Sequence, residues 1–131
     1  MRKHHKLIYI FLACFLFTGP SASGQASVPE VCKDRKTQRE MNECLASAYG
    51  DADSDLNALY TSVKSKLHPA AVTKLQEAQR AWIRYRDSDC EAEAGLYEGG
   101  SIQPAVRWGC LERVTRARIA ELHVIYDTGR R

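Results

Sequence analysis

Hydrophobic residues recur along much of the chain with the spacing of buried helix faces. In the first such segment the apolar positions follow one another in steps of three and four residues, which keeps them on one face of a helix for about seven turns. These positions are Met41, Leu45, Ala48, Ala52, Leu56, Leu59, Val63 and Leu67. Thr37 and Glu40 form a Ser/Thr-x-x-Glu capping box in front of the segment, and His68-Pro69 closes it. We therefore expect a long helix between these two signals, with a bend or short break allowed at Gly50 because glycine weakens a helix interior.

Two further segments repeat this pattern. Pro69 suits the first turn of a second helix, whose pattern fades at Gly95 and ends at Gly99-Gly100-Ser101. Its expected core stripe comprises Val72, Leu75, Ala78, Trp82 and Tyr85, with Ile83 and Cys90 beside it. A third helix is expected from near Pro104 to about Asp127, with apolar positions at Trp108, Leu111, Val114, Ile119, Leu122 and Ile125. No strand-like alternation of useful length occurs, and short connections make consecutive helices antiparallel, so the sequence predicts an all-α fold, a small antiparallel bundle of three main helices.

The first 26 residues have the three-part pattern of a secretory signal peptide. Basic residues precede an uncharged apolar run over residues 7–17, and small residues follow it. That run is about half of the roughly 20 residues that a membrane-spanning helix needs, so we expect a cleaved leader and no stable membrane anchor. Cleavage after Gly24 and cleavage after Ala26 fit equally well. The predicted organisation is a signal peptide over residues 1–26 and one helical domain over residues 27–131.

Cys14 lies within this leader, where a cysteine can be the lipidated residue of a bacterial lipoprotein. The residues before it, Phe11-Leu12-Ala13, match the small-residue lipobox poorly, and apolar residues continue after it. We therefore expect Cys14 to be removed with the leader. The mature protein is predicted to be periplasmic or secreted rather than a lipoprotein.

The net charge changes once the leader is set aside. The whole chain has 19 Lys and Arg against 16 Asp and Glu, a formal charge of +3. Arg2, Lys3 and Lys6 account for the whole excess, because residues 1–26 contain no acidic residue. The expected domain is therefore formally neutral, which argues against a nucleic-acid-binding protein. The 27% of charged residues is ordinary for a folded protein and argues against a disordered one.

Four cysteines remain in the domain, at positions 32, 44, 90 and 110. An even number in a short exported chain predicts two disulfides. An antiparallel bundle gathers all four near one end, so each of the three pairings is open at this point. The spacing does not suit zinc, whose cysteine ligands come in close pairs, and we expect neither a metal nor another cofactor.

No combination of residues predicts catalysis. A Cys–His nucleophile needs a free thiolate, and the cysteines are expected to be oxidised. The carboxylates of Asp87, Asp89, Glu91 and Glu93 are better explained as a solvated acidic helix face than as the catalytic pair of a glycosidase. The protein is therefore predicted not to be an enzyme.

Several motifs of the domain, taken together, resemble one known family. They are Glu40-Met41-Asn42-Glu43-Cys44, Ala52-Asp53-Ser54-Asp55-Leu56-Asn57, Ala78-Gln79-Arg80-Ala81-Trp82-Ile83-Arg84-Tyr85-Arg86-Asp87 with Cys90, and Cys110-Leu111 with Thr115-Arg116-Ala117-Arg118. In this order, from Cys32 to Leu122, they resemble the N-terminal domain of the LprI-type lysozyme inhibitors, which are small exported bacterial helical proteins. The resemblance implies a non-enzymatic protein that binds lysozyme. It also implies the disulfide pairs Cys32–Cys44 and Cys90–Cys110.

The longest of these motifs is interpreted as structural. Trp82 and Tyr85 are expected to fill the space between the helices. Arg86 is expected to pair with a carboxylate, that of Asp53, Asp55 or Asp87, or to stay solvated. The four positions given this structural role are Trp82, Tyr85, Arg86 and Asp87.

The charges of the neutral domain are unevenly distributed along the chain. From Asp87 to Glu98 there are five acidic residues and no Lys or Arg, whereas Arg107 to Arg118 holds four arginines against Glu112 alone. An acidic surface steers a cationic partner, and lysozymes are typically strongly cationic. We therefore expect the acidic helix end and the loop after it to bind at or near the lysozyme cleft. The candidate partner-binding residues are Glu91, Glu93, Tyr97, Glu98, Gly99, Gly100 and Ser101.

The predicted function is that of an exported protein that binds lysozyme stoichiometrically and protects the cell wall. The alternative is an envelope structural or assembly module that binds another envelope protein and has no effect on lysozyme.

Overall fold

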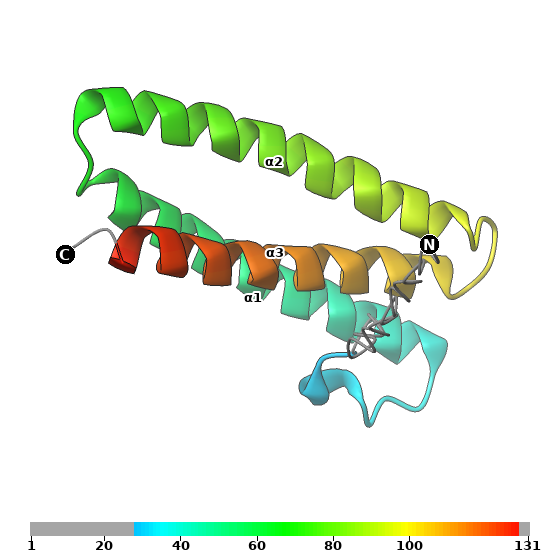
Figure 1. Ribbon diagram of the computed structural model, residues 1–131. Coiled ribbons are helices and arrows are strands. Elements are labelled where there is room, and N and C mark those ends of the chain that lie inside the picture. The colour runs from blue at the N-terminus through cyan, green and yellow to red at the C-terminus, as the bar shows by residue number, and fades with distance from the viewer. Residues whose placement is uncertain (1–27, 129–131) are drawn as a thin grey trace, which may run out of the picture.

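Three long helices make up most of the computed structural model, which describes residues 28–128 (Figure 1). A short 3-10 helix, η1 (Glu30–Cys32), precedes α1 (Gln38–Lys64), α2 (Pro69–Gly95) and α3 (Gln103–Thr128). No strand occurs in the described range, and the all-α prediction is confirmed. None of its helices is both long and apolar enough to cross a membrane. The expected leader over residues 1–26, with Cys14, lies outside the described residues.

Local capping signals define where the first two helices begin. The side-chain oxygen of Thr37 accepts a hydrogen bond from the Glu40 N–H at 3.2 Å, and the Glu40 carboxylate accepts one from the Thr37 N–H at 3.0 Å. This is the predicted capping box, and its backbone donors hold the pKa of Glu40 below its ordinary value. At the start of α2, Nδ1 of His68 accepts a hydrogen bond from the Ala71 N–H at 3.3 Å. The exposed Gly50 lies inside α1 without interrupting it, so the break allowed at this position does not occur.

The main apolar core lies between α1 and α3, which run side by side (Figure 1). On α1 the expected face is buried at Leu45, Ala48, Ala52, Leu56 and Val63. On α3 the buried residues are Ala105, Cys110, Leu111, Thr115 and Leu122. Near the α1–α2 turn, Leu75 of α2 joins Leu56, Val63 and Leu122 in one cluster. The helical spacing of the apolar residues therefore predicted the buried face of α1 correctly.

The buried face of α2 differs from the expected stripe. Tyr85 is 58% exposed and Ile83 is 38% exposed, whereas Gln79 and Arg86 are buried. The expectation that Tyr85 fills the core is therefore wrong, and Arg86 occupies the inward position one residue later. The physical reason is that two carboxylates and two aromatic rings contact the Arg86 side chain, as described below. Trp82 is half-buried and packs against the core, as expected.

Two disulfides connect neighbouring segments of the bundle. Cys32–Cys44 attaches η1 to α1, with 5.8 Å between the Cα atoms. Cys90–Cys110 attaches the end of α2 to the start of α3, with 5.4 Å between the Cα atoms. Both pairings implied by the family resemblance are confirmed.

Candidate functional site

The loop between α2 and α3, residues 96–102, is held in shape by its own backbone. The Gly100 N–H donates to the Tyr97 carbonyl at 2.9 Å, and the Gln103 N–H donates to the Gly100 carbonyl at 3.1 Å. Gly99 has a φ of 74°, a left-handed conformation that side chains disfavour. Its N–H donates to Oε1 of Gln103 at 3.2 Å. The two glycines predicted to form a turn are therefore placed in one tight turn in front of α3.

Contacts with the rest of the bundle also fix this loop. Nδ2 of Asn42 on α1 donates to the Ser101 carbonyl at 3.3 Å. The Cys90–Cys110 disulfide joins the two helices that the loop connects. The loop is thus constrained from both of its helices and from α1, and it has little freedom to lose on binding a partner.

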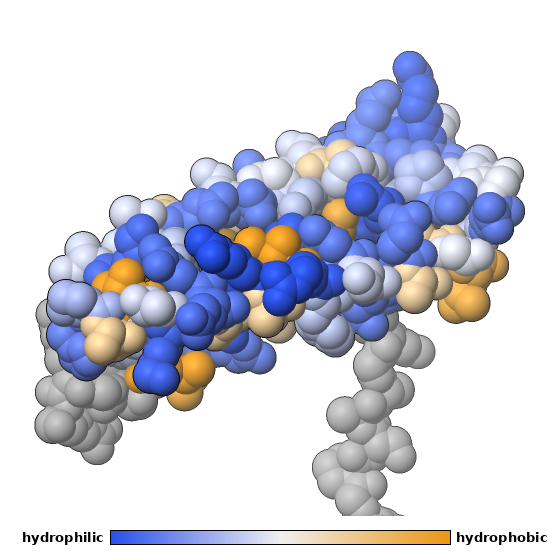
Figure 2. Space-filling view, turned by 90° about the horizontal axis from the view of Figure 1, so that it is seen from above, coloured by the Kyte–Doolittle hydropathy of each residue, from blue (hydrophilic) through white to orange (hydrophobic). Residues whose placement is uncertain are grey.

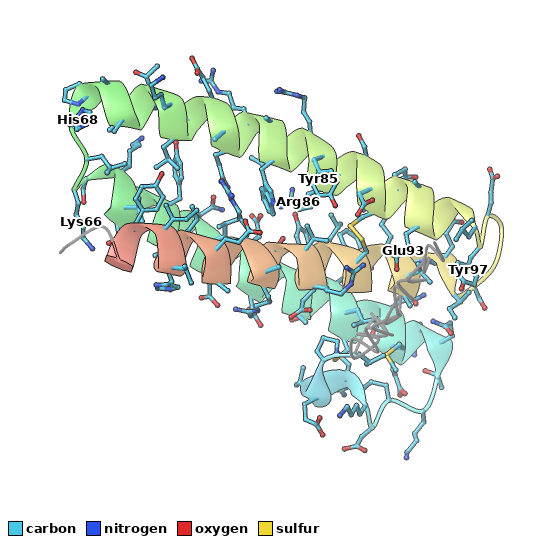
Figure 3. All side chains as sticks on the ribbon, in the orientation of Figure 1. Lys66, His68, Tyr85, Arg86, Glu93 and Tyr97 are labelled. Atoms are coloured by element: carbon cyan, nitrogen blue, oxygen red, sulfur yellow. A yellow bond between two sulfur atoms is a disulfide. The ribbon has the colours of Figure 1, made fainter. Side chains whose placement is uncertain are left out.

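Three large apolar side chains of this loop are exposed. Leu96 is 79%, Tyr97 is 45% and Ile102 is 44% exposed. We call Leu96, Tyr97 and Ile102 the loop patch. Figure 3 shows Tyr97 at the end of the bundle where α2 runs into the loop, with Glu93 in the last turns of α2.

A hollow of about 560 Å³ lies beside the loop patch. Its walls include Met41 and Leu45 of α1 and Ala105 and Val106 of α3, and the three loop-patch side chains also line it. In the view of Figure 2 the surface over α2 is largely hydrophilic and its hydrophobic patches are small and separate, with one at the α2–α3 end. The loop patch and the hollow therefore form one continuous apolar surface at this end of the bundle.

The acidic residues near this loop are largely paired with arginines of α3. Glu91 accepts a hydrogen bond from Nε of Arg107 at 3.0 Å, and Glu93 pairs with Nη2 of Arg113 at 2.8 Å. The expectation of a free acidic surface is therefore wrong at Glu91 and Glu93, because antiparallel packing brings the acidic segment of α2 face to face with the arginines of α3. Within the described range Glu98 forms no ion pair, and it is the exposed acid nearest the turn.

Arg86 forms the main polar contact between α2 and α1. Its Nη1 lies 3.2 Å from Oδ1 of Asp53 on α1, and its Nη2 lies 2.8 Å from Oδ1 of Asp87. The guanidinium carbon is 5.5 Å from the ring centre of Tyr49 and 5.2 Å from that of Trp82. Figure 3 shows the Arg86 side chain extending from α2 toward the other helices. The expected ion pairing of Arg86 is thus confirmed, with Asp53 and Asp87 as its partners.

Aromatic rings continue this layer toward the loop. Tyr49 stacks on Trp108 with 5.7 Å between the ring centres, and the guanidinium of Arg107 lies 5.0 Å from the Trp108 ring. Burial in this layer raises the pKa of Tyr49, and the nearby Arg86 charge opposes the shift. These contacts give the Trp82–Arg86 motif a role in joining the three helices.

Thiol and metal chemistry find no site among residues 28–128. Both cysteine pairs of the described range are oxidised. Among residues 28–128, no three His, Cys, Asp or Glu side chains converge in a way that could hold a metal ion.

Sequence reasoning identified part of this site and missed the rest. It named Tyr97, Glu98 and the Gly99-Gly100-Ser101 turn, which the structure brings together in one loop. It missed the apolar residues Leu96 and Ile102, although both are large hydrophobic side chains beside a glycine turn, which is a signal that could have identified them. Binding of a partner by these residues remains a prediction.

Two comparisons with known proteins found a match to this chain. The family described as Lysozyme inhibitor LprI matches residues 32–122. The chain is also 33% identical, over 141 aligned residues, to an uncharacterized protein of Rhizobium meliloti (strain 1021), and the alignment covers 98% of each chain. No solved structure matches the chain. The family match includes all four paired cysteines and nearly all of the three helices, so the chain belongs to the lysozyme inhibitor LprI family.

Proposed function

We propose that the protein is an exported inhibitor that binds lysozyme in a stoichiometric complex and thereby protects the cell wall. The observation that carries this proposal is the family match over residues 32–122. The signal-peptide pattern of residues 1–26, with cleavage after Gly24 or Ala26, supports export to the compartment in which lysozyme acts. Two disulfides are the usual means of stabilising a small domain in such an oxidising compartment.

The proposed contact surface is the α2–α3 loop with the adjoining end of α2. Tyr97, Glu98 and the Gly99-Gly100-Ser101 turn would face the enzyme, with Glu91 and Glu93 beside them. A constrained loop binds with a small entropy cost. A protein bound at or near the cleft of a glycoside hydrolase blocks the polysaccharide by occupying its place, so inhibition needs no chemistry by the inhibitor.

A turbidity assay on bacterial cell walls tests this function directly. Purified protein is titrated into a fixed concentration of lysozyme, and the rate of clearing is measured. We expect clearing to stop near an equimolar ratio, because a stoichiometric inhibitor removes one enzyme molecule for each molecule added. A reduced and alkylated sample, which lacks both disulfides, is the matched control.

Failure of protection at a large molar excess would refute the proposal. It would favour the alternative, an envelope structural or assembly module that binds another envelope protein. Export is tested separately by the mass of the protein recovered from the periplasm or medium, which should begin at Gln25 or Ser27. Recovery of the intact chain beginning at Met1 would contradict the predicted leader.

A further inference from the structure

We infer that the loop patch and the hollow beside it are the surface through which the protein holds lysozyme, with an apolar side chain of the enzyme seated in the hollow. This inference rests on the proposed function and adds to it a specific source of affinity. The acidic residues near the loop then guide the encounter, and the apolar contact determines how long the complex lasts.

The first argument is the exposure of the loop patch. Leu96 is 79% exposed although it lies at the end of α2, where a polar residue would suit solvent better. Leu96, Tyr97 and Ile102 lie within seven residues of one another and all line the same hollow. Large apolar side chains grouped at one exposed place on a small polar protein mark an interaction surface. Aromatic residues in such a group commonly supply much of the binding energy.

The second argument is the size and rigidity of the receiving surface. A hollow of about 560 Å³ falls within the range of roughly 300–1,000 Å³ that ligand-binding pockets occupy. Its walls come from α1 and α3, which form the best-packed pair of helices, and its outer side comes from a loop held by backbone hydrogen bonds. The surface is therefore formed before binding, which lowers the entropy cost of association.

The third argument identifies the chemistry of the occupant. Five acidic residues lie between Asp87 and Glu98, and two of them, Glu91 and Glu93, are paired with arginines of α3. Glu98 forms no ion pair within the described range and lies directly after Tyr97. Among the described residues that line the hollow, Glu93 is the only charged one, so the hollow with Glu93 and Glu98 beside it is complementary to a partner that presents an apolar side chain next to a basic one. A strongly cationic lysozyme meets this description.

The fourth argument concerns the two acids that are already paired. Glu91 is bound to Arg107 and Glu93 to Arg113, so their charges are largely satisfied within the protein. An acid on the border of an interface mainly changes the association rate and its salt dependence. We therefore expect neutralisation of Glu91 and Glu93 to weaken the complex less than loss of the apolar side chains does.

The experiment compares variants of the purified protein by titration calorimetry against lysozyme. Leu96→Ser and Ile102→Ser remove loop-patch surface, and each is expected to raise Kd by about tenfold or more. Ile125→Ser removes an apolar side chain that is 54% exposed at the opposite end of α3, and it should leave Kd unchanged. The double variant Glu91→Gln, Glu93→Gln should raise Kd by less than either loop-patch variant. Circular dichroism and a thermal melt check that each variant folds, and Tyr97→Ala is a second probe if one does not.

The possible results separate this inference from the proposed function. If the parent protein neither binds nor inhibits lysozyme, the proposed function fails and this inference fails with it. If the parent inhibits lysozyme but Leu96→Ser, Ile102→Ser and Tyr97→Ala bind as tightly as Ile125→Ser, only this inference is overturned. A larger loss of affinity in the Glu91→Gln, Glu93→Gln variant than in the loop-patch variants would overturn it as well, in favour of binding by charge.

Discussion

Replacement of Arg86 by alanine should destabilise the protein more than replacement of any other arginine on α2. The Arg86 side chain is buried, and its guanidinium joins α2 to Asp53 on α1 while lying beside the rings of Tyr49 and Trp82. Because α2 packs mainly against α3, this residue supplies much of the connection between α2 and α1.

The size of the effect follows from the contacts that are lost. Two partly desolvated cation–π contacts contribute about 1 kcal/mol each. The carboxylates of Asp53 and Asp87 are 39% and 53% exposed, so water replaces the guanidinium when it is removed. Their ion pairs therefore count for no more than about 1 kcal/mol together. The expected loss for Arg86→Ala is about 3 kcal/mol, which for a domain of this size corresponds to a fall in Tm of about 12 °C or more.

Chemical denaturation followed by circular dichroism measures this free energy of unfolding. Arg84→Ala is the matched control, since Arg84 is exposed on the same helix, and its effect should stay within about 0.5 kcal/mol. Arg86→Lys keeps the charge but loses the planar group that two carboxylates and two rings contact, so its stability should fall between those of the parent and Arg86→Ala. If Arg86→Ala lies within about 1 kcal/mol of Arg84→Ala, the argument that this residue joins the helices is refuted.

Three further predictions concern the ends of the helices. Glu40→Gln should lower the free energy of unfolding at pH 7 but not at acid pH. A carboxylate whose pKa is lowered by folding stabilises the fold at pH values above its unfolded pKa of about 4.5, and this effect is lost as the pH falls through the folded pKa. Equal differences between variant and parent at both pH values, measured by denaturation, would contradict this. Removal of the Cys90–Cys110 disulfide by double alanine substitution should cost about 3 kcal/mol, because the closed loop spans 20 residues; an unchanged melting temperature would refute the estimate. Gly99→Ala should cost about 1 kcal/mol in the same measurement because of its positive φ, and a neutral result would show that the turn can adopt another conformation.

The parts of the fold that depend on local signals were predictable from the sequence. The Thr37–Glu40 capping box and Pro69 act over three or four residues, so the starts of α1 and α2 were identified from the sequence alone. The buried face of α1 was also identified, because its inward positions are apolar. On α2 the same reasoning selected Tyr85 instead of Arg86, since hydrophobicity cannot predict that a charged residue points inward. The inward position of Arg86 depends on its contacts with Asp53 and Tyr49, which belong to α1.

The candidate site was predictable only where its residues are neighbours in sequence. Tyr97, Glu98 and the two glycines form one segment, and its glycine turn was recognisable. The hollow could not be anticipated, because its walls combine Met41 of α1 with Val106 of α3, which are 65 positions apart. The pairing of Glu91 with Arg107 was missed for the same reason. Each segment was interpreted by its own charge, although the packing of α2 on α3 makes them partners.

The order of the disulfides along the chain has a consequence for biosynthesis. Cys32 pairs with the next cysteine, Cys44, and Cys90 pairs with the next, Cys110. Of the three pairings open to four cysteines, only this one joins each cysteine to its immediate successor. A chain that enters an oxidising compartment from its N-terminus exposes Cys32 and Cys44 together before Cys90 has emerged. If the predicted leader exports the chain in this way, an oxidant acting in order of emergence makes both native bonds directly, and we expect maturation to proceed without a disulfide isomerase.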